Sequence, residues 1–174
     1  HEVGAIGLWQ SLIGVVKEMS LYDDEYFIFC EDDHTFTKHY TPEVLQEGIE
    51  TAKSHNADIL LGGVSWLETA VQVSDRMFWV DKYTGNQFVV IFKKFYPVIL
   101  GITDFENMTA DKKISELSEN KFVIFPFISL QKEFGYSDAT NNNNNTGRVD
   151  YLFDTTIKKL SKIDKVRRYY CNMR

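Results

Sequence analysis

The sequence predicts a single domain of the α/β class, built on a mostly parallel sheet flanked by helices. Three observations support this. A chain of 174 residues has the size of one domain. Its composition, 44% hydrophobic and 14% aromatic, is that of a globular protein. Helical and strand patterns alternate along the first half, which is typical of βαβ units whose ligands bind beyond the carboxyl ends of the strands.

The first elements follow the order helix, strand, helix. Over residues 7–19, apolar side chains recur every three or four positions, which predicts an amphipathic helix. Residues 26–30 form a wholly apolar and aromatic run, which is typical of a buried central strand. Thr41 supplies an N-cap and Pro42 a proline at the first helical position, so a second helix should run to about His55.

The middle of the chain predicts further strands. Residues 58–64 form an apolar run that ends in the flexible pair Gly62 and Gly63. Residues 77–80 and 87–92 indicate two more strands, separated by turn-forming residues.

The second half is predicted to hold two helices, a strand, a loop and a last amphipathic helix. These are expected at residues 93–100, 110–119, 121–125, 132–147 and from 152 onward. Thr109 is placed as the N-cap of the second of these helices.

Charge and cysteine content exclude some classes of function. The net charge of −6 and the pI of about 5.2 argue against a nucleic-acid partner. Cys30 and Cys171 have neither metal-ligand nor redox spacing, which favours a reducing cytosol. No apolar stretch approaches the roughly 18 to 20 residues that span a bilayer, and no leader pattern is visible. We therefore expect a cytoplasmic catalytic domain. Because the chain begins at His1, we also expect that preceding residues are missing.

The main chemical signal is the acidic triplet Glu31, Asp32 and Asp33, which follows the first apolar strand. Three carboxylates at the mouth of a buried strand repel one another, and a divalent cation relieves that repulsion. In an extended chain, Glu31 and Asp33 point to the same side. Mg²⁺ and Mn²⁺ commonly take one or two carboxylates together with substrate phosphates. The alternative is a solvated acidic turn.

Several motifs in order resemble glycosyltransferase family 25, the lipopolysaccharide and collagen galactosyltransferase group. The segment Glu2-Val3-Gly4-Ala5 is similar to the family's Glu-x-Gly-Cys, and residues 26–33 resemble its apolar strand ending in Glu-Asp-Asp. Later blocks that resemble the family occur at residues 59–63, 84–90, 93–95, 110–114 and 125–131. The chain departs from the family at Leu8-Trp9, where Ser-His is usual, and nothing corresponds to the family's first strand and basic segment.

The resemblance implies a GT-A-like fold that lacks part of the N-terminal nucleotide-binding half. It implies transfer of a hexose, often galactose from UDP-galactose, to a saccharide acceptor in surface polysaccharide or lipopolysaccharide synthesis. Asp33 and Glu31 would be the ligands of Mn²⁺ or Mg²⁺. The nucleotide-sugar donor would be bound by Glu31, Asp32, Gly62 and Gly63. Asp111 would be the general base that deprotonates the acceptor hydroxyl.

Each of these residues also has a structural interpretation. Asp111 can serve as an acid in the first turn of a helix, and the glycine pair can form a plain tight turn. Trp66, Trp79 and Tyr83 can stack on sugar rings or fill the core. His34 can be a metal ligand or a surface residue.

The last helix and the rival functions complete the prediction. The basic C-terminal helix can hold the enzyme against an anionic membrane with a lipid-linked acceptor, or it can present a solvated face.

The rival functions are a metal-dependent phosphohydrolase and a degenerate family member that only binds saccharide or a partner.

Overall fold

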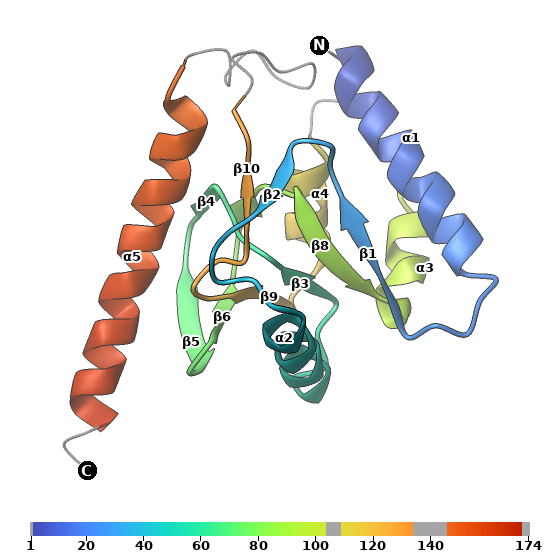
Figure 1. The fold of residues 1–174 in the computed structure, drawn as a ribbon. Coiled ribbons are helices and arrows are strands. Elements are labelled where there is room, and N and C mark those ends of the chain that lie inside the picture. The colour runs from blue at the N-terminus through green and yellow to red at the C-terminus, as the bar shows by residue number, and fades with distance from the viewer. Residues whose placement is uncertain (1, 104–108, 134–145, 172–174) are drawn as a thin grey trace.

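A computed structural model describes residues 2–103, 109–133 and 146–171 (Figure 1). The helices are α1 (Glu2–Met19), α2 (Pro42–Ser54), α3 (Tyr96–Leu100), α4 (Ala110–Leu117) and α5 (Arg148–Cys171), with a 3-10 turn η1 (Lys93–Phe95) before α3. The strands are β1 (Tyr26–Cys30), β2 (His34–Phe36), β3 (Ile59–Leu61), β4 (Trp66–Leu67), β5 (Ala70–Ser74), β6 (Met77–Val80), β7 (Tyr83–Thr84), β8 (Phe88–Phe92), β9 (Lys121–Ile124) and β10 (Ser129–Gln131).

The main sheet has six strands in the order β1-β8-β3-β9-β6-β5. Only β3 and β9 pair in parallel, and the other four pairs are antiparallel. The α/β class is confirmed, but the prediction of a mostly parallel sheet is wrong. It fails because β8 inserts between β1 and β3 in the opposite direction, and because β6 returns from β5 through a tight turn instead of a helix.

Strand direction still gathers several chain ends at one edge of the sheet. Because β1 and β3 are both antiparallel to β8, and β9 is parallel to β3, these three strands run the same way. Their carboxyl ends therefore lie at the same edge as the amino end of β8. Two short ribbons, β10 with β2 and β4 with β7, form separate two-stranded sheets.

Helices cover both faces of the sheet because the strands bury alternate residues on opposite sides. Leu60 and Val90 pack with Ile49 and Ala52 of α2, which covers one face. On the other face lies a larger cluster, with contributions from α1, α3, α4 and α5. It includes Trp9, Leu12, Ile59, Leu61, Ile99, Ile114 and Phe153.

Helix α5 lies along the side of the molecule, next to β4 and β5 (Figure 1). Phe153 and Leu160 enter the core from it. The Thr156 hydroxyl donates to the Ser65 carbonyl at 2.8 Å, and Gln72 donates to Asp164 at 2.8 Å. Among the described helices, none is long and apolar enough to cross a membrane.

Two local predictions on the first half can be compared with the structure. The Thr41 hydroxyl accepts a hydrogen bond from the Val44 amide at 3.2 Å, so the predicted cap of α2 is confirmed. Strand β1 has the predicted bounds, but it is an edge strand rather than a central one, and Ile28 is 41% exposed. Most of the loop predicted at 132–147 lies outside the described residues, which omit 134–145.

Candidate functional site

The acidic triplet forms a tight turn directly after β1. The Glu31 amide donates to the Gln87 carbonyl at 3.1 Å, and the His34 amide donates to the Glu31 carbonyl at 3.2 Å. The chain is therefore not extended here, and the three side chains have different surroundings. Asp32 is exposed, whereas Glu31 and Asp33 are partly buried.

Glu31 has the most perturbed carboxyl group of the site. Burial and, in decreasing order of importance, the negative charges of Asp33, Asp111 and Asp32 together raise its pKa to about 8. Glu31 is therefore mostly protonated at neutral pH. The charge of Asp111 acts on Glu31 although the two residues are far apart in the sequence, so the fold brings α4 close to the triplet.

Asp33 is oriented by a hydrogen bond and retains a free acceptor atom. The Gln131 side-chain amide donates to its Oδ2 at 2.6 Å, and the Lys132 amide donates to its backbone carbonyl at 2.7 Å. Its pKa is raised, chiefly by burial. Its Oδ1 is buried and has no hydrogen-bond partner among the described residues. A buried, unpaired carboxylate oxygen has the character of a cation ligand.

His34 joins the triplet to β10. Its Nδ1 lies 2.7 Å from the Ser129 hydroxyl, and its ring packs edge-on to Phe36 and tilted against Phe88. Burial lowers its pKa. Its Nε2 is buried and has no partner within the described part of the chain. His34, the first residue of β2, is therefore packed against β10 and does not lie on an open surface.

The glycine pair follows β3 and packs against β10. The Gly62 carbonyl accepts from the amides of Ile128 and Ser129 at 2.9 and 3.1 Å, and the Gly63 carbonyl accepts from the Gln87 side chain at 3.0 Å. A Cβ on Gly63 would lie 2.2 Å from the Ser129 carbonyl oxygen. Close backbone packing therefore accounts for Gly63. Contact of this pair with a donor nucleotide remains a prediction.

Asp111 lies in the first turn of α4 and holds the turn that follows β7. Its carboxylate accepts from the amides of Gly85 and Lys112 at 2.9 and 2.8 Å, and from the Thr109 hydroxyl. Gly85 has a φ of 109°, a left-handed conformation that favours glycine. The charge of Asp111 acts on Glu31, and its role as a general base stays a prediction. The hydrogen bonds also give Asp111 a structural role.

Two buried polar residues of this region, Asn86 and Gln87, were not identified from the sequence as site residues. The Tyr83 hydroxyl donates to Asn86 at 3.1 Å, and Gln87 is fully buried. Burial and the charges of Asp111 and Glu31 raise the pKa of Tyr83 well above its ordinary value. The sequence offers one signal for these residues, because two amide side chains, Asn86 and Gln87, stand directly before the wholly apolar β8.

The oxygen donors present suit a hard divalent cation with an incomplete protein shell. Within the described residues, no group of three or more His, Cys, Asp or Glu side chains is arranged to hold a metal. Asp33 and Glu31 can supply two carboxylate groups, and substrate phosphates and water normally complete the shell of Mg²⁺. Two carboxylates are the donor set that the predicted Mn²⁺ or Mg²⁺ would use, and binding of a metal stays a prediction.

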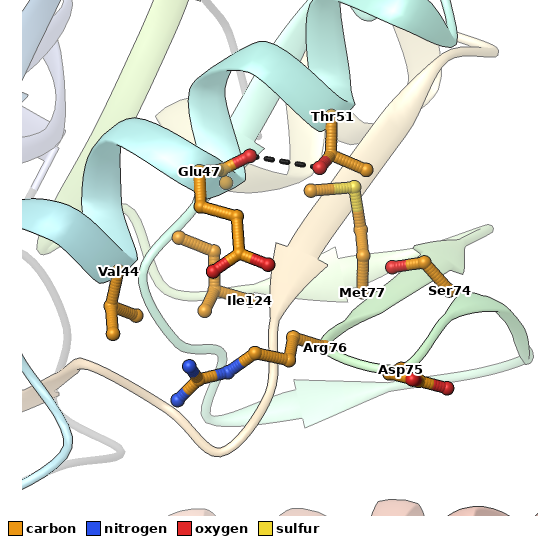
Figure 2. Close-up of a pocket in the computed structure, with 9 residues that line it drawn as sticks. Val44, Glu47, Thr51, Ser74, Asp75, Arg76, Met77 and Ile124 are labelled. Atoms are coloured by element: carbon orange, nitrogen blue, oxygen red, sulfur yellow. Dashed lines mark hydrogen bonds between the residues drawn. The ribbon is translucent and has the colours of Figure 1, made fainter.

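The structure also shows two cavities away from the triplet. One, of about 220 Å³, lies between α2 and the turn joining β5 to β6, and Figure 2 shows Glu47 and Arg76 on its walls. The other, of about 400 Å³, lies between α4 and the β4–β7 ribbon. Trp66 lines the second cavity and is 45% exposed, and the buried Tyr83 forms part of its wall. Trp79 instead donates its indole N–H to the Glu119 carbonyl.

The candidate site thus consists of two coupled carboxyl groups, Glu31 and Asp33, with Asp111 close enough for its charge to act on Glu31. Polar contacts from Gln87, Ser129 and Gln131 hold the surrounding turns. In comparisons with known proteins, no family model, curated protein or solved structure matches this chain.

Proposed function

We propose that the protein is a metal-dependent glycosyltransferase that moves a hexose, such as the galactose of UDP-galactose, to a saccharide acceptor in surface polysaccharide or lipopolysaccharide synthesis. The carrying observation is the coupling of Glu31 to Asp33 and Asp111 at the edge where β1 and β3 end. The ordered motifs that resemble glycosyltransferase family 25 support the proposal, and so does the α/β fold with helices on both faces of a sheet.

In this proposal Asp33 and Glu31 hold Mn²⁺ or Mg²⁺ through carboxylate oxygens. The unpaired Oδ1 of Asp33 provides the first ligand, because Gln131 fixes the other oxygen and so orients the group. Glu31 would lose its proton to solvent and become the second ligand. A cation bound there would stabilise the charge that develops on the departing nucleotide diphosphate. Asp32 is exposed beside them and adds negative charge.

Asp111 is the predicted general base, but its contacts favour a positioning role. Both of its oxygens already accept hydrogen bonds, from Gly85, Lys112 and Thr109. A base must reach the proton that it removes, at about 2.6 to 3.2 Å. We therefore propose that Asp111 chiefly fixes the turn after β7 and keeps negative charge near Glu31.

The proposal is tested by ligand binding and by turnover. A thermal-shift screen of UDP-sugars with and without Mn²⁺ should give a metal-dependent rise in melting temperature with one donor, since a ligand of the folded state stabilises it. Asp33→Asn should abolish that rise and hexose transfer while the protein stays folded. Asp154→Asn, an exposed carboxylate on α5, is the matched control. Undiminished turnover by Asp33→Asn would remove the metal role.

A second candidate is a degenerate member of the same family that binds a nucleotide sugar without transferring it. The engaged carboxylate of Asp111 favours it, because both oxygens of the predicted base already accept hydrogen bonds. A metal-dependent thermal shift without product would indicate this function. Phosphate release without sugar transfer would indicate a phosphohydrolase.

We further propose that the acceptor is lipid-linked and that α5 contacts the membrane from the cytoplasmic side. Lys158, Lys162 and Lys165 are exposed at helical spacing, and Tyr169 is 62% exposed beyond them. These lysines have no ion-pair partner among the described residues, whereas the chain as a whole is acidic. Basic residues with aromatic neighbours favour the interface of an anionic bilayer.

A further inference from the structure

The larger cavity, of about 400 Å³, is an open pocket that lies between one helix face and one strand ribbon. Lys112, Ser115 and Glu116 line it from α4, and they share a face because residues three and four positions apart are neighbours on a helix. Opposite them, Trp66 of β4 pairs with Thr84 of β7. The volume is within the range of small-molecule sites.

The walls of this cavity combine an aromatic surface with balanced charges. Trp66 is 45% exposed, so its indole is accessible to a ligand. Tyr83 is buried and its amide donates to the Ser115 hydroxyl at 3.0 Å, which fixes the back wall. Within the part of the chain that the structure describes, neither the Lys112 ammonium nor the Glu116 carboxylate has an ion-pair partner. Lys82 on the rim pairs with Glu68 at 3.5 Å.

This combination matches the chemistry of an uncharged sugar. A pyranose ring has an apolar C–H face that suits an aromatic surface. Its hydroxyl groups both donate and accept, so they can bond to an ammonium and a carboxylate at the same time. A strongly anionic ligand would meet Glu116, and a strongly cationic one would meet Lys112. The near balance of charge therefore favours a neutral ligand.

We propose that this cavity binds an uncharged saccharide, with one ring face on Trp66 and its hydroxyls bonded to Lys112 and Glu116. The cavity lies away from the acidic triplet but next to Asp111. Lys112 follows Asp111 directly, and Thr84 precedes the glycine whose amide bonds to Asp111. The assignment of this saccharide as the acceptor rests on the proposed transferase function, whereas the binding itself rests on the cavity alone.

Saturation-transfer NMR can measure the binding directly, with lactose and methyl β-galactopyranoside as probes and EDTA present. At least one probe should show saturation with the unaltered protein. Trp66→Ala should weaken its binding about tenfold through loss of the stacking surface, and Lys112→Gln severalfold. Trp66→Phe keeps an aromatic ring and should retain most of the affinity. Lys38→Gln, an exposed lysine outside the cavity, should bind as the unaltered protein does.

Three results would overturn the proposal: no saturation of either sugar, unchanged affinity in Trp66→Ala, or uridine monophosphate binding that depends on Trp66. The last would make the cavity a nucleotide site. Circular dichroism establishes whether each variant is folded, and Trp66→Phe keeps the test decisive if Trp66→Ala unfolds. Asp33→Asn should retain sugar binding while it loses the metal-dependent effect of UDP-sugars. Saccharide binding and the transferase function can therefore fail independently.

Discussion

Replacement of Glu31 by Gln should change the pH dependence of stability. The folded protein holds the Glu31 proton up to a pKa of about 8, whereas the ordinary value is 4.5. The unfolded chain therefore releases this proton at lower pH than the folded chain does. Because the folded chain binds this proton more tightly than the unfolded chain does, Glu31 contributes to the free energy of unfolding. This contribution is complete below pH 4.5 and is lost as the pH rises from 4.5 to about 8. At 1.36 kcal/mol per pKa unit, the loss is on the order of 4 kcal/mol.

Urea unfolding in EDTA, from about pH 5 to about pH 9, measures this effect. The free energy of unfolding of Glu31→Gln relative to the unaltered protein should rise by on the order of 4 kcal/mol across this range. Glu18→Gln, an exposed carboxylate on α1, should show no such trend. Mn²⁺ should stabilise the unaltered protein more at pH 8 than at pH 6, because it binds the deprotonated group. Parallel curves for Glu31→Gln and the unaltered protein would refute the reasoning.

Three further predictions concern the metal, the packing and the membrane. Asp33→Asn should lose the Mn²⁺-dependent thermal shift with UDP-sugars and keep its circular dichroism spectrum; a retained shift would contradict the assignment of Asp33 as a ligand. Gly63→Ala should destabilise the fold by about 3 kcal/mol or more in urea unfolding, because its Cβ would meet the Ser129 carbonyl oxygen at 2.2 Å. Gly14→Ala on α1 has open space around it and should instead stabilise by about 0.5 to 1 kcal/mol; equal effects of the two changes would argue against close packing. Replacement of Lys158, Lys162 and Lys165 by Gln should weaken binding to phosphatidylserine vesicles in co-sedimentation by roughly a hundredfold. Each lysine near an anionic surface contributes about 1 kcal/mol. If the unaltered protein bound neutral vesicles with equal affinity, an electrostatic contact would be excluded.

Local patterns located most of the longer elements. Residues 77–80 form β6 as predicted, and the helix predicted at 110–119 is observed as Ala110–Leu117. These elements were predictable because hydrophobic spacing and caps act over a few residues. The apolar run of β1 was also located, but not its place at the sheet edge. A run of five apolar residues looks the same whether one or two strands flank it.

Strand direction was not predictable in the same way. Residues 71–74 alternate apolar and polar side chains, which is a strand signal, and β5 pairs with β6 through a tight turn. That hairpin and the inverted β8 make the sheet largely antiparallel. The direction of β8 depends on which neighbours it meets, and those neighbours are distant in sequence.

The candidate site was predictable only in its individual acids. The triplet follows an apolar strand and Asp111 opens a helix, and both are visible in the sequence. The contacts of Gln131 with Asp33 and of Ser129 with His34 were not, because they depend on β10 pairing with β2. Whether the site binds metal, donor and acceptor stays a prediction.

The shared direction of β1, β3 and β9 has a consequence for how the molecule folds and melts. The acids after β1, the glycines after β3 and the polar groups of β10 meet only when β1, β8 and β3 have paired and the β10–β2 ribbon has formed. Such long-range contacts form late and slowly compared with helical ones. Affinity for any ligand of this edge should therefore vanish in the same cooperative transition as the circular dichroism signal, without a separate stage in which an otherwise folded protein has lost its site.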